Sequence, residues 1–97
     1  MRVIAKKTLR DYWKLHNDCK GHLTSWYDDA VHADWKSPVY IKRDYPSASI
    51  ISNNRIVFNI KGNSYRLIVK INYGYGIVWI RFIGTHADYD KVNAENI

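Results

Sequence analysis

Several side chains in the second half of the chain are suited to chemistry on a phosphate group. Lys61 and Arg66 lie on either side of a Gly-Asn pair. His86 follows the last apolar run, and Tyr89 and Lys91 come shortly after it. Histidine exchanges protons near neutral pH, and the cations of arginine and lysine stabilise negative charge that develops in a transition state.

This combination suits RNA cleavage in which the substrate supplies its own nucleophile. A base removes the proton of the 2′-hydroxyl, the cations stabilise the phosphorane, and an acid protonates the departing 5′-oxygen. Because RNA supplies its own nucleophile, such a reaction needs neither a serine nor a metal ion, and we expect no cofactor. A single histidine at the start of a helix is also common as an exposed residue without a catalytic role.

The residues around Lys61 and Arg66 predict a β-hairpin. From Asn54 onward apolar residues alternate with polar ones, in three runs separated by "GN" and by "YGYG". Both separators are typical of tight turns. A two-residue Gly-Asn turn places Asn59 opposite Arg66 and Arg55 opposite Lys70. Three successive strands with short loops predict an antiparallel meander.

This register divides the strand residues between two faces. One face is apolar, includes Phe82 opposite Leu67, and is the expected core. The other includes Ile83 and has five cations and no carboxylate; its polar and aromatic members are Arg55, Asn59, Lys61, Arg66, Lys70, Trp79 and Arg81. A solvated face usually mixes both signs of charge, so this face could bind phosphates, with a base on Trp79. Lysine and arginine on a solvated sheet face without any function remain the alternative.

Two amphipathic helices precede the strands. Apolar residues recur at helical spacing in the stretches 8–17 and 22–33, with Thr8 as the expected N-cap of the first helix. A turn around Gly21 is expected to join them. Ser37 followed by proline predicts one further helical turn.

The two ends of the chain complete the predicted fold. Residues 2–5 form a short strand candidate, and Thr85 with Asp88 predicts a capped helical turn that places His86 beside Arg66. The sequence therefore predicts an α+β fold in the order β-α-α-β-β-β with a short C-terminal helical turn. The two helices cover one face of the antiparallel meander.

Length, charge and composition limit the class of protein. A chain of 97 residues suits one small domain, residues 1–97. The net charge of +6 favours a polyanionic partner such as nucleic acid, an acidic protein or an anionic membrane surface. The single Cys19 indicates a free thiol in a reducing cytosol. Because no signal-like or spanning apolar segment is found, we expect a cytoplasmic protein with no membrane partner.

The strings "FNIKGNSYRL" and "THADYDK" resemble the most distinctive motifs of the HigB family of toxins, within the RelE/ParE superfamily. The resemblance extends over residues 55–92. It implies a RelE-like fold and an mRNA interferase that cleaves messages translated on the ribosome. It also implies neutralisation by a HigA-type helix-turn-helix antitoxin, contacts with ribosomal RNA, and no small-molecule cofactor.

The resemblance also implies roles for individual residues. The expected catalytic residues are Lys61, Arg66, His86 and Tyr89. The expected RNA-binding residues are Asn59 and Lys91, together with Arg55, Lys70, Trp79 and Arg81 from the cationic sheet face. No metal ligands are expected. The general base is open between Lys61 and Tyr89. A second catalytic histidine is not expected, because His16, His22 and His32 all fall on predicted helices.

Two other classes of protein remain as alternatives. A ParE-like toxin of the same fold would lack the catalytic set of Lys61, Arg66 and His86. A non-catalytic RNA- or DNA-binding regulator would use the basic sheet face without needing the histidine.

Overall fold

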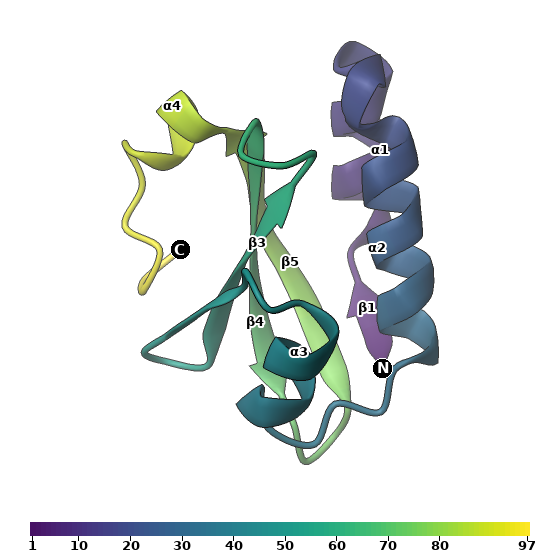
Figure 1. Cartoon of the computed structure of the whole chain (residues 1–97), viewed down its shortest axis with the longest axis vertical. Coiled ribbons are helices and arrows are strands. Elements are labelled where there is room, and N and C mark those ends of the chain that lie inside the picture. Colours follow the sequence, from purple (N-terminus) through teal and green to yellow (C-terminus); the bar gives the residue numbers. More distant parts are fainter.

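The strands form one five-stranded mixed sheet in the order β1-β5-β4-β3-β2 (Figure 1). The computed structural model describes the whole chain, residues 1–97. The strands are β1 (Arg2–Ile4), β2 (Ser49–Ile51), β3 (Arg55–Ile60), β4 (Tyr65–Asn72) and β5 (Ile77–Thr85). β1 runs parallel to β5, and every other neighbouring pair is antiparallel. The predicted meander is therefore the centre of a wider sheet.

The helices are α1 (Lys6–Leu15), the 3-10 turn η1 (Asn17–Cys19), α2 (Lys20–His32), α3 (Pro38–Asp44) and α4 (His86–Tyr89). α1 and α2 lie together on one side of the sheet, and the C-terminal segment lies on the other (Figure 1). The α+β class and the covering of one face by two helices are confirmed.

The helix starts differ from the predicted ones. Ala5, not Thr8, is the N-cap of α1, and the Thr8 amide already donates to the Ala5 carbonyl. Gly21 lies inside the first turn of α2, and η1 joins the helices instead. The Cys19 thiol donates to the carbonyl of His16 there. α1 therefore begins before Thr8, and no side-chain hydrogen bond caps its start.

One helix is longer than predicted, and one strand was not predicted. Ser37 and Pro38 occupy the N-cap and first positions as predicted, but α3 continues to Asp44. β2, a strand of three residues, was not among the predicted elements. It joins β3 through Asn53 and Asn54, both at a φ of 60°, a conformation that asparagine tolerates better than most residues.

The register of the first hairpin is confirmed, with Asn59 opposite Arg66 and Arg55 opposite Lys70. In the second hairpin, the prediction fails beyond the pair of Val69 and Ile80 because a β-bulge shifts the register.

The bulge exchanges the faces of two β5 residues. Leu67 pairs with Ile83 and Ile68 pairs with Phe82. Ile83 therefore joins the core at 9% exposure, whereas Phe82 does not belong to the buried cluster. The predicted places of these two side chains were wrong.

Large aromatic side chains fill the space between the helices and the sheet. Trp26 of α2 meets Phe58 of β3 edge to face at 5.3 Å, and Trp35 stacks on Phe58 at 6.0 Å.

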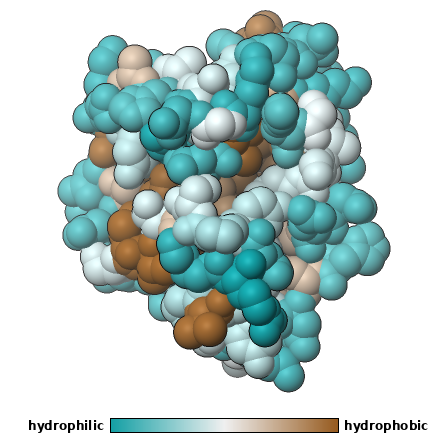
Figure 2. All heavy atoms as spheres, viewed as in Figure 1, coloured by the Kyte–Doolittle hydropathy of each residue, from teal (hydrophilic) through white to brown (hydrophobic).

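Hydrophilic residues cover most of the face seen in Figure 2, and its apolar patches are small. None of the helices combines the length and apolar character that crossing a bilayer requires.

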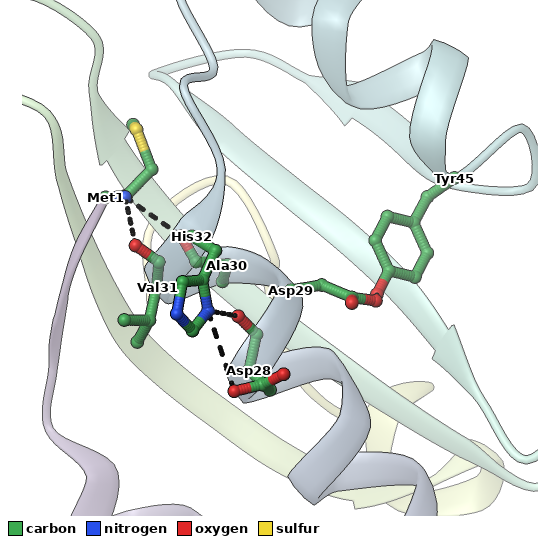
Figure 3. A network of polar contacts seen from close by, with 7 residues as sticks. All are labelled: Met1, Asp28, Asp29, Ala30, Val31, His32 and Tyr45. Atoms are coloured by element: carbon green, nitrogen blue, oxygen red, sulfur yellow. Dashed lines mark hydrogen bonds and ion pairs between the residues drawn. The ribbon is translucent and has the colours of Figure 1, made fainter.

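The far end of α2 is tied down by polar contacts (Figure 3). The Met1 amino group donates to the carbonyls of Ala30 and Ala33 at 2.9 and 2.8 Å, which satisfies the end of the helix. The Tyr45 hydroxyl donates to Asp29 and so links α3 to α2. Burial and this hydrogen bond raise the pKa of Tyr45.

Candidate active site

The ends of β4 and β5 bring the β3–β4 turn and α4 together. Tyr65 pairs with Thr85, and Arg66 pairs with Gly84. The amide of His86 donates to the carbonyl of Ser64 at 3.2 Å. The Thr85 hydroxyl accepts from the amide of Asp88 at 3.1 Å, which confirms the predicted cap of α4. His86 therefore starts a helical turn beside the hairpin.

Arg66 is held by its neighbours but is not paired with a carboxylate. Its guanidinium donates to the Asn63 carbonyl at 3.1 Å and to the Asn63 side-chain oxygen at 3.2 Å. The guanidinium carbon lies 5.8 Å from the centre of the Tyr89 ring. These contacts fix the orientation of the guanidinium and leave its charge available to an anion.

His86 lies on the exposed side of α4, with 52% of its side chain accessible. Its Nδ1 atom is 3.3 Å from Asp90 Oδ2, one helical turn further along. A carboxylate on one ring nitrogen favours the tautomer that leaves the other nitrogen free. The Nε2 atom of His86 can therefore exchange a proton with a substrate.

Lys61 does not lie on the cationic face, contrary to the prediction. Its φ is +53°, so its side chain leaves the alternation of β3 and turns toward the helices. There its Nζ atom lies 2.8 Å from Asp18 Oδ2, and the Tyr65 hydroxyl donates to the same carboxylate at 2.7 Å. Lys61 and Arg66 thus belong to opposite sides of the hairpin.

These bonds change the protonation of their partners. The hydrogen bond from Lys61, followed by that from Tyr65, lowers the pKa of Asp18 below its usual value. The hydrogen bond to Asp18 raises the pKa of Tyr65 to about 12. At neutral pH Asp18 is therefore ionised, and Tyr65 keeps its proton.

A groove of about 590 Å³ runs between α2 and the hairpin, and Asp18, His22, Asn59, Lys61 and Gly62 are among its lining residues. A neighbouring hollow of about 390 Å³ is lined by Ser47, Asn59, Gly62 and Asn63. Asn59 and Gly62 line both, so the two hollows adjoin at the hairpin. Lys61 lines the first, and Asn63, which holds Arg66, lines the second.

His22 was not among the predicted site residues, because the sequence indicated only its place on a helix. Asp18 and His22 are four residues apart, a spacing that puts both on one side of a helical segment. That spacing was the only feature of the sequence that pointed to them as a pair. Their place in the lining of the groove depends on the tertiary fold.

The predicted open face of the sheet is partly covered by the C-terminal segment. Both Arg55 and Arg81 donate to a main-chain oxygen of Ile97. Val57 and Ile68, predicted on this same face, are only 2% and 0% exposed. The prediction of an uncovered face was therefore wrong, because the chain beyond α4 folds back over it.

The other predicted RNA-binding residues lie in separate places. Asn59 lines the groove, and its side chain approaches the Ser47 carbonyl at 3.5 Å. Lys70 and Trp79 lie together and half-exposed, with the lysine nitrogen 5.8 Å from the ring centre. Lys91 is exposed just beyond α4.

The fold and the sequence match a known class of protein. Residues 19–92 match a family described as the RelE-like toxic component of a toxin-antitoxin system. The chain belongs to this family, the HigB toxins. The resemblance predicted from the two motifs is confirmed, as is the RelE-like fold. A toxin of this kind has an antitoxin as its partner.

Curated relatives cover nearly the whole chain. It is 26% identical over 96 residues to the mRNA interferase toxin HigB of Escherichia coli strain K12, covering 97% of this chain and 92% of the relative. The mRNA interferase HigB of Shigella flexneri gives the same values. The mRNA interferase HigB of Escherichia coli O6:H1 is 24% identical over 94 residues, covering 95% and 91%.

Proposed function

We propose that this toxin is an endoribonuclease that cleaves mRNA where the β3–β4 hairpin meets α4. The relatives that span most of the chain are named mRNA interferases. The observation that carries the proposal is the arrangement of Arg66. Its guanidinium is fixed by Asn63, has no carboxylate partner, and lies between the hairpin tip and the ring of Tyr89.

Arg66 binds the scissile phosphate and stabilises the phosphorane. His86 and Tyr89 supply the base and the acid. The base takes the proton of the 2′-hydroxyl while the 2′-oxygen forms a bond to phosphorus, and the acid protonates the 5′-oxygen as its bond to phosphorus breaks. The products are a 2′,3′-cyclic phosphate and a 5′-hydroxyl, and no metal ion takes part.

Lys61 binds RNA in the groove and does not act as the general base. Its ammonium is already hydrogen-bonded to Asp18 on the helix side of the hairpin. An RNA strand that lies across the two adjoining hollows would run from Lys61 past Asn59 and Asn63 toward Arg66. Phosphate contacts along it make binding strongly dependent on salt.

The proposed partners are those that the resemblance to the toxin family implies, and the positive charge of the chain supports an RNA partner. The substrate is mRNA engaged with the ribosome, where the net charge of +6 favours contacts with ribosomal RNA. The antitoxin is a helix-turn-helix protein of the HigA type. With these partners, the proposed location of the toxin is the cytoplasm.

Induced expression followed by mapping of mRNA 5′ ends tests the proposal, with Arg66→Ala as the control. We expect new 5′ ends within translated messages for the native chain and none for the variant. Equal sets of ends from both proteins would contradict the proposal. A non-catalytic regulator would change growth without producing any new ends.

A further inference from the structure

One main-chain oxygen of Ile97 is bound by two arginines of the sheet. Arg55 donates to it from Nε and Nη2 at 3.3 and 2.8 Å, and Arg81 donates from Nε at 3.2 Å. These arginines come from β3 and β5, on either side of the central β4. Neither forms an ion pair with a carboxylate side chain, and Arg55 also donates from Nη1 to the Asn53 carbonyl at 3.0 Å.

Two guanidinium groups that converge on one oxygen form an arrangement suited to a phosphodiester. A phosphodiester presents two anionic oxygens, and arginine binds such groups through paired, charge-assisted hydrogen bonds. One phosphate between the arginines would give each of them an anionic oxygen. In this structure, both arginines share one oxygen atom of Ile97, the last residue of the printed sequence.

The surroundings extend this position into a site for a nucleotide. Arg55 pairs with Lys70 across β3 and β4, and Lys70 pairs with Trp79 across β4 and β5. Trp79 is half-exposed, with the Lys70 ammonium 5.8 Å from its ring. An aromatic ring beside a phosphate site is the usual means of holding an unpaired base.

Besides the two arginines, one side chain outside the C-terminal segment, residues 93–97, forms a hydrogen bond with it. The Asn53 side chain donates to the carbonyl of Glu95 at 3.2 Å. The Asn93 side chain accepts from the amide of Glu95 at 3.2 Å, and the amide of Ile97 donates to the Asn93 carbonyl. The match to the toxin family ends at residue 92, before this segment begins.

We propose that Arg55 and Arg81 form a second phosphodiester-binding site for RNA, which the C-terminal segment covers until the RNA displaces it. The inference rests on the proposed function, since it takes RNA as the ligand. The inference adds an RNA contact on the sheet face, away from the cleavage site. It also adds a segment of the same chain that competes with RNA for this contact.

The segment can be loosened without disturbing the sheet. Asn53 and Asn54 both have a φ of 60°, which glycine adopts without strain. Asn53→Gly removes the hydrogen bond to Glu95, and Asn54→Gly is the matched control that removes no contact with the segment. Asn93→Ala is a second variant that breaks the turn within the segment.

The probe is a fluorescent 2′-O-methyl oligoribonucleotide, which binds but cannot be cleaved. We expect Asn53→Gly and Asn93→Ala to bind it about three to ten times more tightly than the native chain, because the site is open in a larger fraction of molecules. The salt dependence of log K should stay the same in these variants, because the complex makes the same phosphate contact once the segment is displaced. It should become shallower by about 0.7 in Arg55→Gln/Arg81→Gln, which lacks that contact. Asn54→Gly should match the native chain.

Arg55→Gln/Arg81→Gln separates site competition from a structural effect. Adding Asn53→Gly to this double variant should give no tighter binding. The inference is overturned if neither Asn53→Gly nor Asn93→Ala tightens binding, or if the gain persists without the arginines. Because this assay measures binding alone, a failure of cleavage, tested through Arg66, would be seen separately.

Discussion

The guanidinium carbon of Arg66 lies 5.8 Å from the centre of the Tyr89 ring, although the two residues come from separate elements. Arg66 belongs to β4 and Tyr89 to α4. The two elements are joined by the hydrogen bond from the His86 amide to the Ser64 carbonyl. The proposed active site therefore depends on the pairing of the hairpin turn with the start of α4.

Arg66→Ala should reduce mRNA cleavage by about 100- to 1,000-fold, the loss typical of removing one group that stabilises transition-state charge. Its melting temperature should stay close to that of the native chain, because no ion pair is broken. Single-turnover cleavage and thermal unfolding measure the two effects. Arg10→Ala, at an exposed arginine of α1, is the control; full activity in a folded Arg66→Ala protein would remove Arg66 from the reaction.

His86→Gln should lower the cleavage rate by about 100- to 10,000-fold, the range for losing a general acid or base. Affinity for the 2′-O-methyl RNA should stay near the native value, since glutamine keeps a polar group of similar size. His32→Gln, at an exposed histidine on α2, should change neither quantity. An equal loss of binding and of rate would show that His86 binds RNA and transfers no proton.

Asn63→Ala tests whether Asn63 positions Arg66. We expect the cleavage rate to fall by about tenfold, a step of about 1.4 kcal/mol in the barrier, with affinity for RNA changing less. Asn63→Asp should bind RNA more weakly than Asn63→Ala, because the new carboxylate would pair with Arg66 and compete with the RNA phosphate. If Asn63→Asp bound RNA as tightly as the native chain, Arg66 would not be the phosphate-binding group.

Lys61→Gly should weaken RNA binding by about two- to fivefold, as for one exposed charged contact, and leave the rate at saturating RNA nearly unchanged. Glycine suits this position because its φ is +53°. Lys14→Ala, at another exposed lysine, provides the comparison. A large fall in the rate at saturation would instead identify Lys61 as the general base.

The pair of Asp18 and Lys61 should make stability depend on pH at the acid end. The hydrogen bonds lower the pKa of Asp18 in the folded chain below its ordinary value of 3.8. Ionised Asp18 therefore stabilises the fold above about pH 4, and this contribution disappears as the pH falls through the lowered pKa. Urea unfolding should show Asp18→Asn less stable than the native chain at pH 7, with the difference shrinking below pH 4. A difference that stayed constant down to pH 3 would contradict the lowered pKa.

The sequence predicted those parts of the site that depend on local chemistry. The Gly-Asn turn determines that Asn59 faces Arg66, and the hydroxyl of Thr85 determines where α4 begins. Both features are set by residues close together in the chain, so a pattern of two or three residues was enough to place Arg66 on β4 and His86 at the start of α4, beside the hairpin turn.

The remainder depends on contacts that a local pattern does not contain. The bulge beside Val69 is one extra residue whose place is decided by packing, and it moved Ile83 into the core. The left-handed backbone of Lys61 directs its side chain away from the cationic face, where the sequence placed it, and toward Asp18 of η1. The folding of residues 93–97 onto Arg55 leaves no periodic signal in the sequence.

The chemical ends of the mRNA fragments test the proposed reaction most directly. Fragments made in a translating extract by the native chain should carry a 2′,3′-cyclic phosphate and a 5′-hydroxyl, and the Arg66→Ala chain should make none. Fragments with a 3′-hydroxyl and a 5′-phosphate would show that water, and not the 2′-hydroxyl, attacks the phosphate, and would contradict the roles proposed for Arg66, His86 and Tyr89.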